Sequence, residues 1–109
     1  MTEHYEVGDF VAERLYTDTK VWEVVAVSKS GTTLTLRDTR RTGERELDRA
    51  CDHSADGAYG VYRHFVESDE HGREVTVRRR KHGGFAVGRE GGSISKLNGR
   101  AAERVDWRY

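Results

Sequence analysis

The sequence predicts a mainly β fold in one domain, residues 1–109, built as a small barrel or a strongly twisted antiparallel sheet. Apolar residues recur with a period of two over short stretches, which is the pattern of half-buried strands. Turn residues, above all glycine, separate these stretches. Only 35% of the residues are hydrophobic and 35% are charged. The core must therefore be thin, which suits a small barrel better than a layered enzyme fold.

The first two strands are expected at residues 10–16 and 21–27. The pair Gly8-Asp9 forms a turn before the first strand, and the polar corner 17–20 separates the two. The second stretch is rich in valine, a β-branched residue that strands favour. A Gly-Asp turn before a valine-rich strand is common in SH3-like barrels, so we expect a barrel of that kind, with five to seven short strands.

The clearest hairpin joins residues 21–27 to a strand at 32–37 through the turn Ser28–Gly31. Alternation along the returning strand separates two faces, with Leu34 and Leu36 on one and Thr33, Thr35 and Arg37 on the other. A Lys-Ser pair beside glycine is also found in phosphate-binding loops. Such a loop needs several glycines before the lysine and a helix after it. Here a strand follows, so a plain turn is favoured, with Lys29 as a phosphate contact in second place.

Later elements are shorter. Residues 39–43 are expected as a loop, 44–47 as a short strand and 48–60 as a mobile excursion, since that stretch is polar and lacks periodicity. Further strands are expected at 61–67, 74–80, 85–87 and 94–97, with turns at 68–72 and 82–84. The chain is expected to close with a short helical turn within residues 100–108, where Ala101 and Val105 would share a face.

The densest basic run is Arg78–His82. If Val75 and Val77 point inward, alternate residues such as Arg78 and Arg80 line the outer face and can contact phosphates. The alternative is a solvated edge strand, whose charges deter pairing with other molecules. The predicted polyanion-binding set is Arg78, Arg80, Lys81, Lys29 and Arg37, and the candidates for stacking on bases are Phe85, Trp107 and Tyr109.

The net charge of zero conceals an uneven distribution. Residues 1–76 carry a net charge of −6 and residues 77–109 carry +6. The basic C-terminal third is therefore suited to a polyanion, or the two parts of the chain neutralise each other on folding.

The sequence gives weaker support for catalysis or metal binding than for binding of a polyanion. Cys51, Asp52 and His53, with Asp56 and His64, resemble metal ligands or a Cys-His nucleophile, but a structural zinc site needs paired ligands and there is one cysteine. The carboxylates of 69–71 are better explained as a turn, and the pair Glu103 and Asp106 as ion-pair partners of nearby arginines. We therefore expect no enzyme activity, no metal and no cofactor.

Cellular location follows from similar observations. The single cysteine cannot form an internal disulfide, which agrees with a reducing cytoplasm. No apolar run approaches the roughly 20 residues that cross a bilayer, and the acidic N-terminus does not have the character of a signal peptide. A cytoplasmic protein without membrane contact is expected.

Three stretches, 16–37, 75–85 and 93–109, resemble a family of small phage and prophage proteins. In that family a VSKSG hairpin is followed by a Thr/Arg-rich strand and by a C-terminus with the spacing of Gly99, Glu103, Asp106 and Tyr109. Residues 38–62 take no part, and the family typically has proline where this chain has Trp107. The resemblance implies a small viral accessory protein that acts by binding in the cytoplasm of a bacterial host.

Together these observations predict a non-enzymatic binding protein that contacts nucleic acid through a basic strand. Two alternatives stay open. One is an inhibitor of a host protein, such as a defence factor, that uses residues 38–60 and exposed aromatic side chains. The other is a sponge for a nucleotide signal. The oligomeric state is left open.

Overall fold

A computed structural model describes residues 4–15, 19–47, 61–81, 84–87, 92–97 and 99–106. These residues form seven strands, and all the strand pairs are antiparallel. The strands are β1 (Phe10–Arg14), β2 (Thr19–Val27), β3 (Thr33–Leu47), β4 (Val61–Ser68), β5 (Glu74–Arg78), β6 (Ile94–Lys96) and β7 (Ala102–Asp106). The described residues contain no helix long and apolar enough to span a membrane. The mainly β prediction is confirmed.

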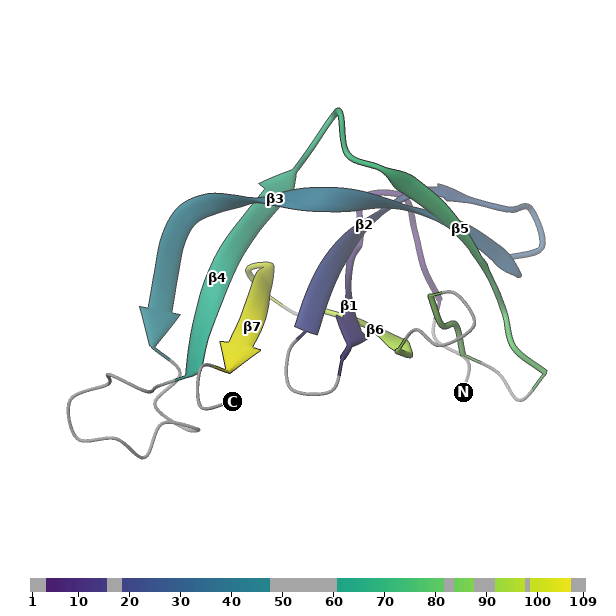
Figure 1. Ribbon diagram of the computed structural model, residues 1–109. Coiled ribbons are helices and arrows are strands. Elements are labelled where there is room, and N and C mark those ends of the chain that lie inside the picture. The colour runs from purple at the N-terminus through teal and green to yellow at the C-terminus, as the bar shows by residue number, and fades with distance from the viewer. Residues whose placement is uncertain are drawn as a thin grey trace.

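The strands follow the order β6-β1-β2-β3-β4-β7, and β5 pairs with the N-terminal part of β3. β3 runs along the crest of an arch and bends down beside β4 at its C-terminal end (Figure 1). We call β1, β2, β5, β6 and residues 33–38 of β3 the barrel half, since this part of the sheet curls on itself. Residues 39–47 of β3, together with β4 and β7, form the wing.

The expected loop at 39–43 is wrong, because β3 continues through it as one strand of 15 residues. Three successive residues of this stretch pair with β4, in the register Thr39↔Ser68, Arg40↔Glu67 and Arg41↔Val66. The register then shifts between Arg41 and Arg45, where Gly43 adopts a positive φ of 96°. The glycine that suggested a loop instead forms an irregularity of the kind that bends a strand.

The expected helical turn near the C-terminus is also wrong over residues 102–106, which form β7 on the free edge of β4. The register runs from Phe65↔Ala102 to Val61↔Asp106. A helix this short has little stability of its own, whereas the edge of β4 offers unsatisfied backbone groups along five residues. The predicted mobile excursion at 48–60 lies outside the described residues.

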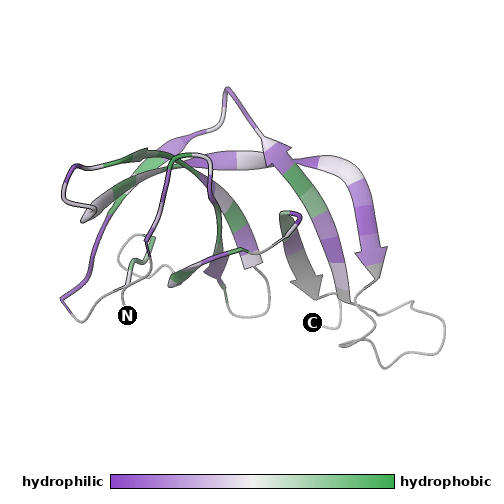
Figure 2. Cartoon of the chain, turned by 180° about the vertical axis from the view of Figure 1, so that it is seen from behind, coloured by the Kyte–Doolittle hydropathy of each residue, from purple (hydrophilic) through white to green (hydrophobic). Residues whose placement is uncertain are grey.

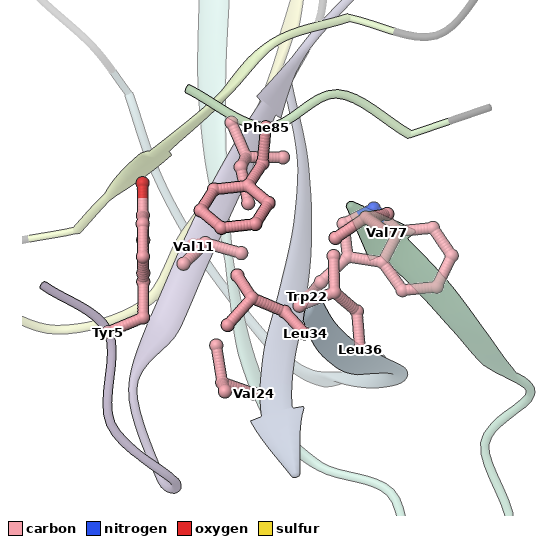
Figure 3. Packing of buried hydrophobic residues seen from close by; sticks show 9 residues of the cluster. Tyr5, Val11, Trp22, Val24, Leu34, Leu36, Val77 and Phe85 are labelled. Atoms are coloured by element: carbon pink, nitrogen blue, oxygen red, sulfur yellow. The ribbon is translucent and has the colours of Figure 1, made fainter. Parts of the chain in front are cut away.

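The larger core fills the barrel half, and its side chains point toward one another from opposing strands (Figure 3). Its buried members are Tyr5, Val11, Trp22, Val24, Leu34, Leu36, Val77, Phe85 and Ile94. Leu34 and Leu36 are fully buried, as the alternation predicted. Isolated bridges Arg79↔Phe85 and Ala86↔Ser93 connect the end of β5 to the start of β6. These bridges draw the two edges of the barrel half together over the core.

A smaller cluster of Val21, Val66 and Ala101, with Phe10 and Leu97 against it, joins the wing to the barrel half. Val21 and Trp22 are neighbours in β2 and are both buried, yet they belong to different clusters because successive side chains point to opposite faces. Figure 2 shows the same division, with apolar bands on the barrel half and a mostly hydrophilic bent end of β3.

Candidate polyanion-binding site

β5 has the orientation that its sequence predicted. Val77 is buried and Val75 is partly buried, whereas Thr76 and Arg78 are exposed. Arg80 and Lys81, which follow the strand, are also exposed. Arg78 and Arg80 therefore present their charges to solvent.

The turn between β2 and β3 lies beside the C-terminal end of β5, because Thr33 pairs with Arg78. The contact continues beyond the strand, where the backbone N–H of Arg79 donates to the Thr32 carbonyl at 2.8 Å. Lys29 in this turn thus joins the basic run of β5. We call the resulting group the cationic end; its members are Lys29, Arg78, Arg79, Arg80 and Lys81.

Arg37 does not belong to this group. It lies at the other end of the β3–β5 pairing, opposite Glu74, and its Nη2 donates to Glu74 Oε2 at 2.9 Å. The expectation that Arg37 acts with Lys29 and Arg78 is corrected, because its guanidinium is already paired within the sheet.

Arg79 was not selected from the sequence, although alternation would have found it. Val75, Val77 and Arg79 share the period of two, so the side chain of Arg79 follows the inward row. Its Nη2 donates to the Gly31 carbonyl at 3.3 Å, and its guanidinium carbon lies 5.5 Å from the centre of the Phe85 ring. The Nε of Arg79 is buried and has no hydrogen-bond acceptor among the described residues.

A cavity of about 170 Å³ opens at the cationic end. It is lined by His4, Tyr5, Val27, Ser28, Lys29, Ser30, Gly31, Leu34 and Arg79. The hairpin turn forms one wall and is held by its own hydrogen bonds, with Ser28 Oγ accepting from the Thr33 N–H at 3.0 Å. The turn that was predicted as a plain corner is therefore also one side of a cavity that contains an arginine and a lysine.

Carboxylate partners divide the described cations into two groups. Eight cations form ion pairs, namely Lys20 and Arg73 with Asp38, Arg37 with Glu74, Arg40 with Glu67, Arg41 with Glu103, Arg63 with Glu46, Lys96 with Asp9 and Arg100 with Glu44. Within the described ranges, no member of the cationic end has such a partner. The acidic residues of 1–76 therefore neutralise the basic residues of 77–109 only in part. Lys96 and Arg100 form ion pairs with carboxylates of the first part, whereas residues 78–81 form none within the described ranges.

Of the predicted stacking residues, the structure describes Phe85, and this ring is not available for stacking on a base. Phe85 is only 2% exposed and meets Tyr5 edge to face at 5.5 Å between ring centres, so no base can stack on it. Its prediction as a stacking residue is corrected. Trp107 and Tyr109 lie outside the described residues.

The weaker chemical candidates are accounted for where the structure describes them. Glu103 accepts from the Val21 N–H at 3.0 Å and pairs with Arg41, so this carboxylate has a structural role. In a turn, the Asp69 carboxylate accepts from the His71 N–H, and the Asp69 backbone carbonyl accepts from the Gly72 N–H. Residues 51–56 lie outside the described part of the chain. The described part contains no group of three or more side chains that could hold a metal ion.

His64 of the wing has a buried Nε2 without a hydrogen-bond partner in the described part of the chain. Burial, together with the nearby Arg41 and Arg45, lowers the pKa of His64 below 6.5, and Glu103 offsets this in part. This histidine is thereby kept neutral near physiological pH.

One buried carboxylate was missed by sequence reasoning. Glu13 is 5% exposed; it accepts from Trp22 Nε1 at 2.9 Å and from the Gly92 N–H at 3.2 Å. Its place on the inward face of β1 follows from alternation with Val11, but its partners are distant in the sequence: Trp22 lies on β2, and Gly92 precedes β6. Its interactions orient Trp22 in the core.

Comparison of the chain with family models, with curated proteins and with solved structures gives no match in any of the three.

Proposed function

We propose that this protein is a small, non-enzymatic accessory protein of phage type that binds the phosphate backbone of a nucleic acid at its cationic end, in the cytoplasm of a bacterial host. The observation that carries the proposal is the gathering of five cations without carboxylate partners among the described residues, in a chain that pairs eight others. Like charges held together repel one another. A bound polyanion relieves this repulsion and releases its own counterions.

The barrel half supports a binding role of this kind. We infer that it is a small SH3-like barrel, because five strands curl antiparallel and the bridges at Phe85 and Ala86 bring its edges together. In such a barrel the turn at Ser28–Gly31 and the end of β5 form one rim. β3 and β5 flank this rim, and Arg78 lies on β5 itself. A framework of paired strands limits the motion of the rim, which lowers the entropy cost of binding.

The site supports contacts to phosphates rather than to bases. Arg78 and Arg80 are exposed cations on successive outward positions, and Phe85, the aromatic ring closest to them in sequence, is buried. Phosphate contacts position a nucleic acid without reading its sequence. We therefore expect similar affinity for strands of different base composition.

Fluorescence anisotropy with a short labelled single-stranded oligonucleotide tests the proposal. Four exposed cations, Lys29, Arg78, Arg80 and Lys81, predict a slope of roughly −3 in a plot of log affinity against log salt concentration, since each contact to a single strand contributes about −0.7. Absence of binding at low ionic strength, or binding that does not depend on salt, would exclude a nucleic-acid role.

A matched pair of double variants separates a defined site from overall charge. The site variant combines Arg78→Glu with Arg80→Glu. The control combines Arg40→Glu with Arg63→Glu; it changes the net charge by the same amount, but its two arginines lie in the wing and are paired with carboxylates. We expect the first pair to weaken binding by about tenfold or more and the second to change it little. Equal losses would mean that net charge alone governs binding.

A further inference from the structure

We infer that the cavity at the cationic end is a phosphomonoester site and that it holds the terminal phosphate of the bound strand. The assignment to a strand end rests on the proposed function. The cavity itself stands on its own geometry, since Arg79 and Lys29 both line a space of about 170 Å³.

The donor that points to a ligand is Arg79. One end of its guanidinium is held by the Gly31 carbonyl at 3.3 Å, and its plane lies near the Phe85 ring, so its position is set by the protein. Its buried Nε nevertheless lacks an acceptor among the described residues. A buried donor without an acceptor costs free energy. The guanidinium therefore gains stability if it turns toward an anion in the cavity that the side chain lines.

The hairpin turn adds neutral polar groups to the lining of the cavity. Ser28 and Ser30 both line the cavity, and their hydroxyl oxygens are 3.4 Å apart. The backbone N–H groups of Lys29 and Ser30 donate to no carbonyl in the described part of the chain. Successive free N–H groups and hydroxyls in a tight turn are typical of anion-binding concavities.

The remaining walls and the charges favour a terminal phosphate over an internal one. Tyr5, Val27 and Leu34 add apolar side chains to the lining, and these offer no partner to the further charged phosphates of a strand that continues in both directions. A phosphomonoester carries a charge of about −1.5 to −2 near neutral pH, which two cations, Lys29 and Arg79, neutralise. The exposed carboxylate of Glu6 lies 3.9 Å from Nε2 of the lining residue His4.

The experiment compares three internally labelled oligothymidylates of the same length, with a 5′-phosphate, a 3′-phosphate or hydroxyls at both ends. Anisotropy at fixed salt is expected to give about tenfold tighter binding for one phosphorylated strand than for the hydroxyl strand, the ratio that one added charge-assisted hydrogen bond supplies. Which end is preferred reports the polarity of the bound strand.

Two sets of variants assign the preference to the cavity. Arg79→Gln and Lys29→Gln should each abolish the preference. Lys29→Gln should also weaken the hydroxyl strand modestly, since one of its four backbone contacts is lost, but should not abolish its binding. Arg78→Gln with Arg80→Gln should weaken every strand by a similar factor and keep the preference. Lys29 is exposed, so Lys29→Gln keeps the test decisive if the Arg79 variant fails to fold.

The outcomes separate this inference from the proposed function. Equal binding of all three strands overturns the phosphomonoester site and leaves backbone binding intact. If no strand binds, the proposed function is overturned. Calorimetry with inorganic phosphate then tests the phosphomonoester site by itself, and the absence of a heat of binding overturns that site as well. Thymidine 5′-monophosphate that binds more tightly than the phosphorylated strand overturns the assignment to a strand end and identifies a free nucleotide as the ligand.

Discussion

The cationic end and the wing contain the same kinds of basic side chains but differ in what surrounds them. In the wing, arginines of β3 and β4 face carboxylates on neighbouring strands, as in Arg40–Glu67 and Arg63–Glu46. At the cationic end the basic side chains have no such partners among the described residues. A count of basic residues would not distinguish the two regions as candidate ligand-binding surfaces. Only the pairing distinguishes a charged surface that serves the fold from one that is available to a ligand.

The two regions also differ in their cores, and this difference should give the largest effects. Leu36→Ala in the barrel half removes a fully buried side chain from a core of nine residues, and should lower the free energy of unfolding by about 2–5 kcal/mol. Val66→Ala, on the wing side of the smaller cluster, removes fewer atoms and should cost less. Urea unfolding of both variants measures the two losses in free energy of unfolding. A larger loss for Val66→Ala would contradict the assignment of the main core to the barrel half.

Two glycines provide a matched comparison, with the next largest expected loss of stability. Gly31 and Gly43 have positive φ angles of 74° and 96°, and a methyl group at either meets no atom within 4 Å. Gly31→Ala and Gly43→Ala should therefore each cost roughly 1–2 kcal/mol through backbone strain alone. Only Gly31 lines the cavity, so only Gly31→Ala should also weaken binding of a phosphorylated strand. If both variants lose affinity equally, the turn is not part of the site.

A smaller effect should appear as a pH dependence in the wing. Because the pKa of His64 is lower in the folded state than its ordinary 6.5, the unfolded chain binds more protons between these two values. The contribution of neutral His64 to stability is therefore full above pH 6.5 and is lost as the pH falls toward the folded pKa. Urea midpoints between pH 7.5 and pH 5 should decline for the parent protein and decline less for His64→Gln. Identical profiles would show that His64 titrates alike in both states.

The smallest effects test the pairing itself. Arg63→Gln removes an exposed ion pair with Glu46 and should lower stability by at most about 1 kcal/mol. Arg78→Gln removes one of several like charges without a carboxylate partner among the described residues, so it should leave stability unchanged or raise it slightly, most clearly at low salt. Thermal unfolding at two salt concentrations measures both. A loss for Arg78→Gln equal to that for Arg63→Gln would remove the contrast between the two regions.

The period of two in the sequence determined the strand character, the hairpin around Ser28–Gly31 and the inward and outward faces of β5. These features depend on residues close together in the chain. The tertiary structure decided the length of β3 and the existence of β7, because both depend on pairing with β4. It also decided the site: Arg37 is neutralised by Glu74, 37 residues away, and Lys29 and Arg79 line the same cavity because Thr33 pairs with Arg78. Alternation shows which way a side chain points, but only the register between distant strands determines which charges are paired and which are left for a ligand.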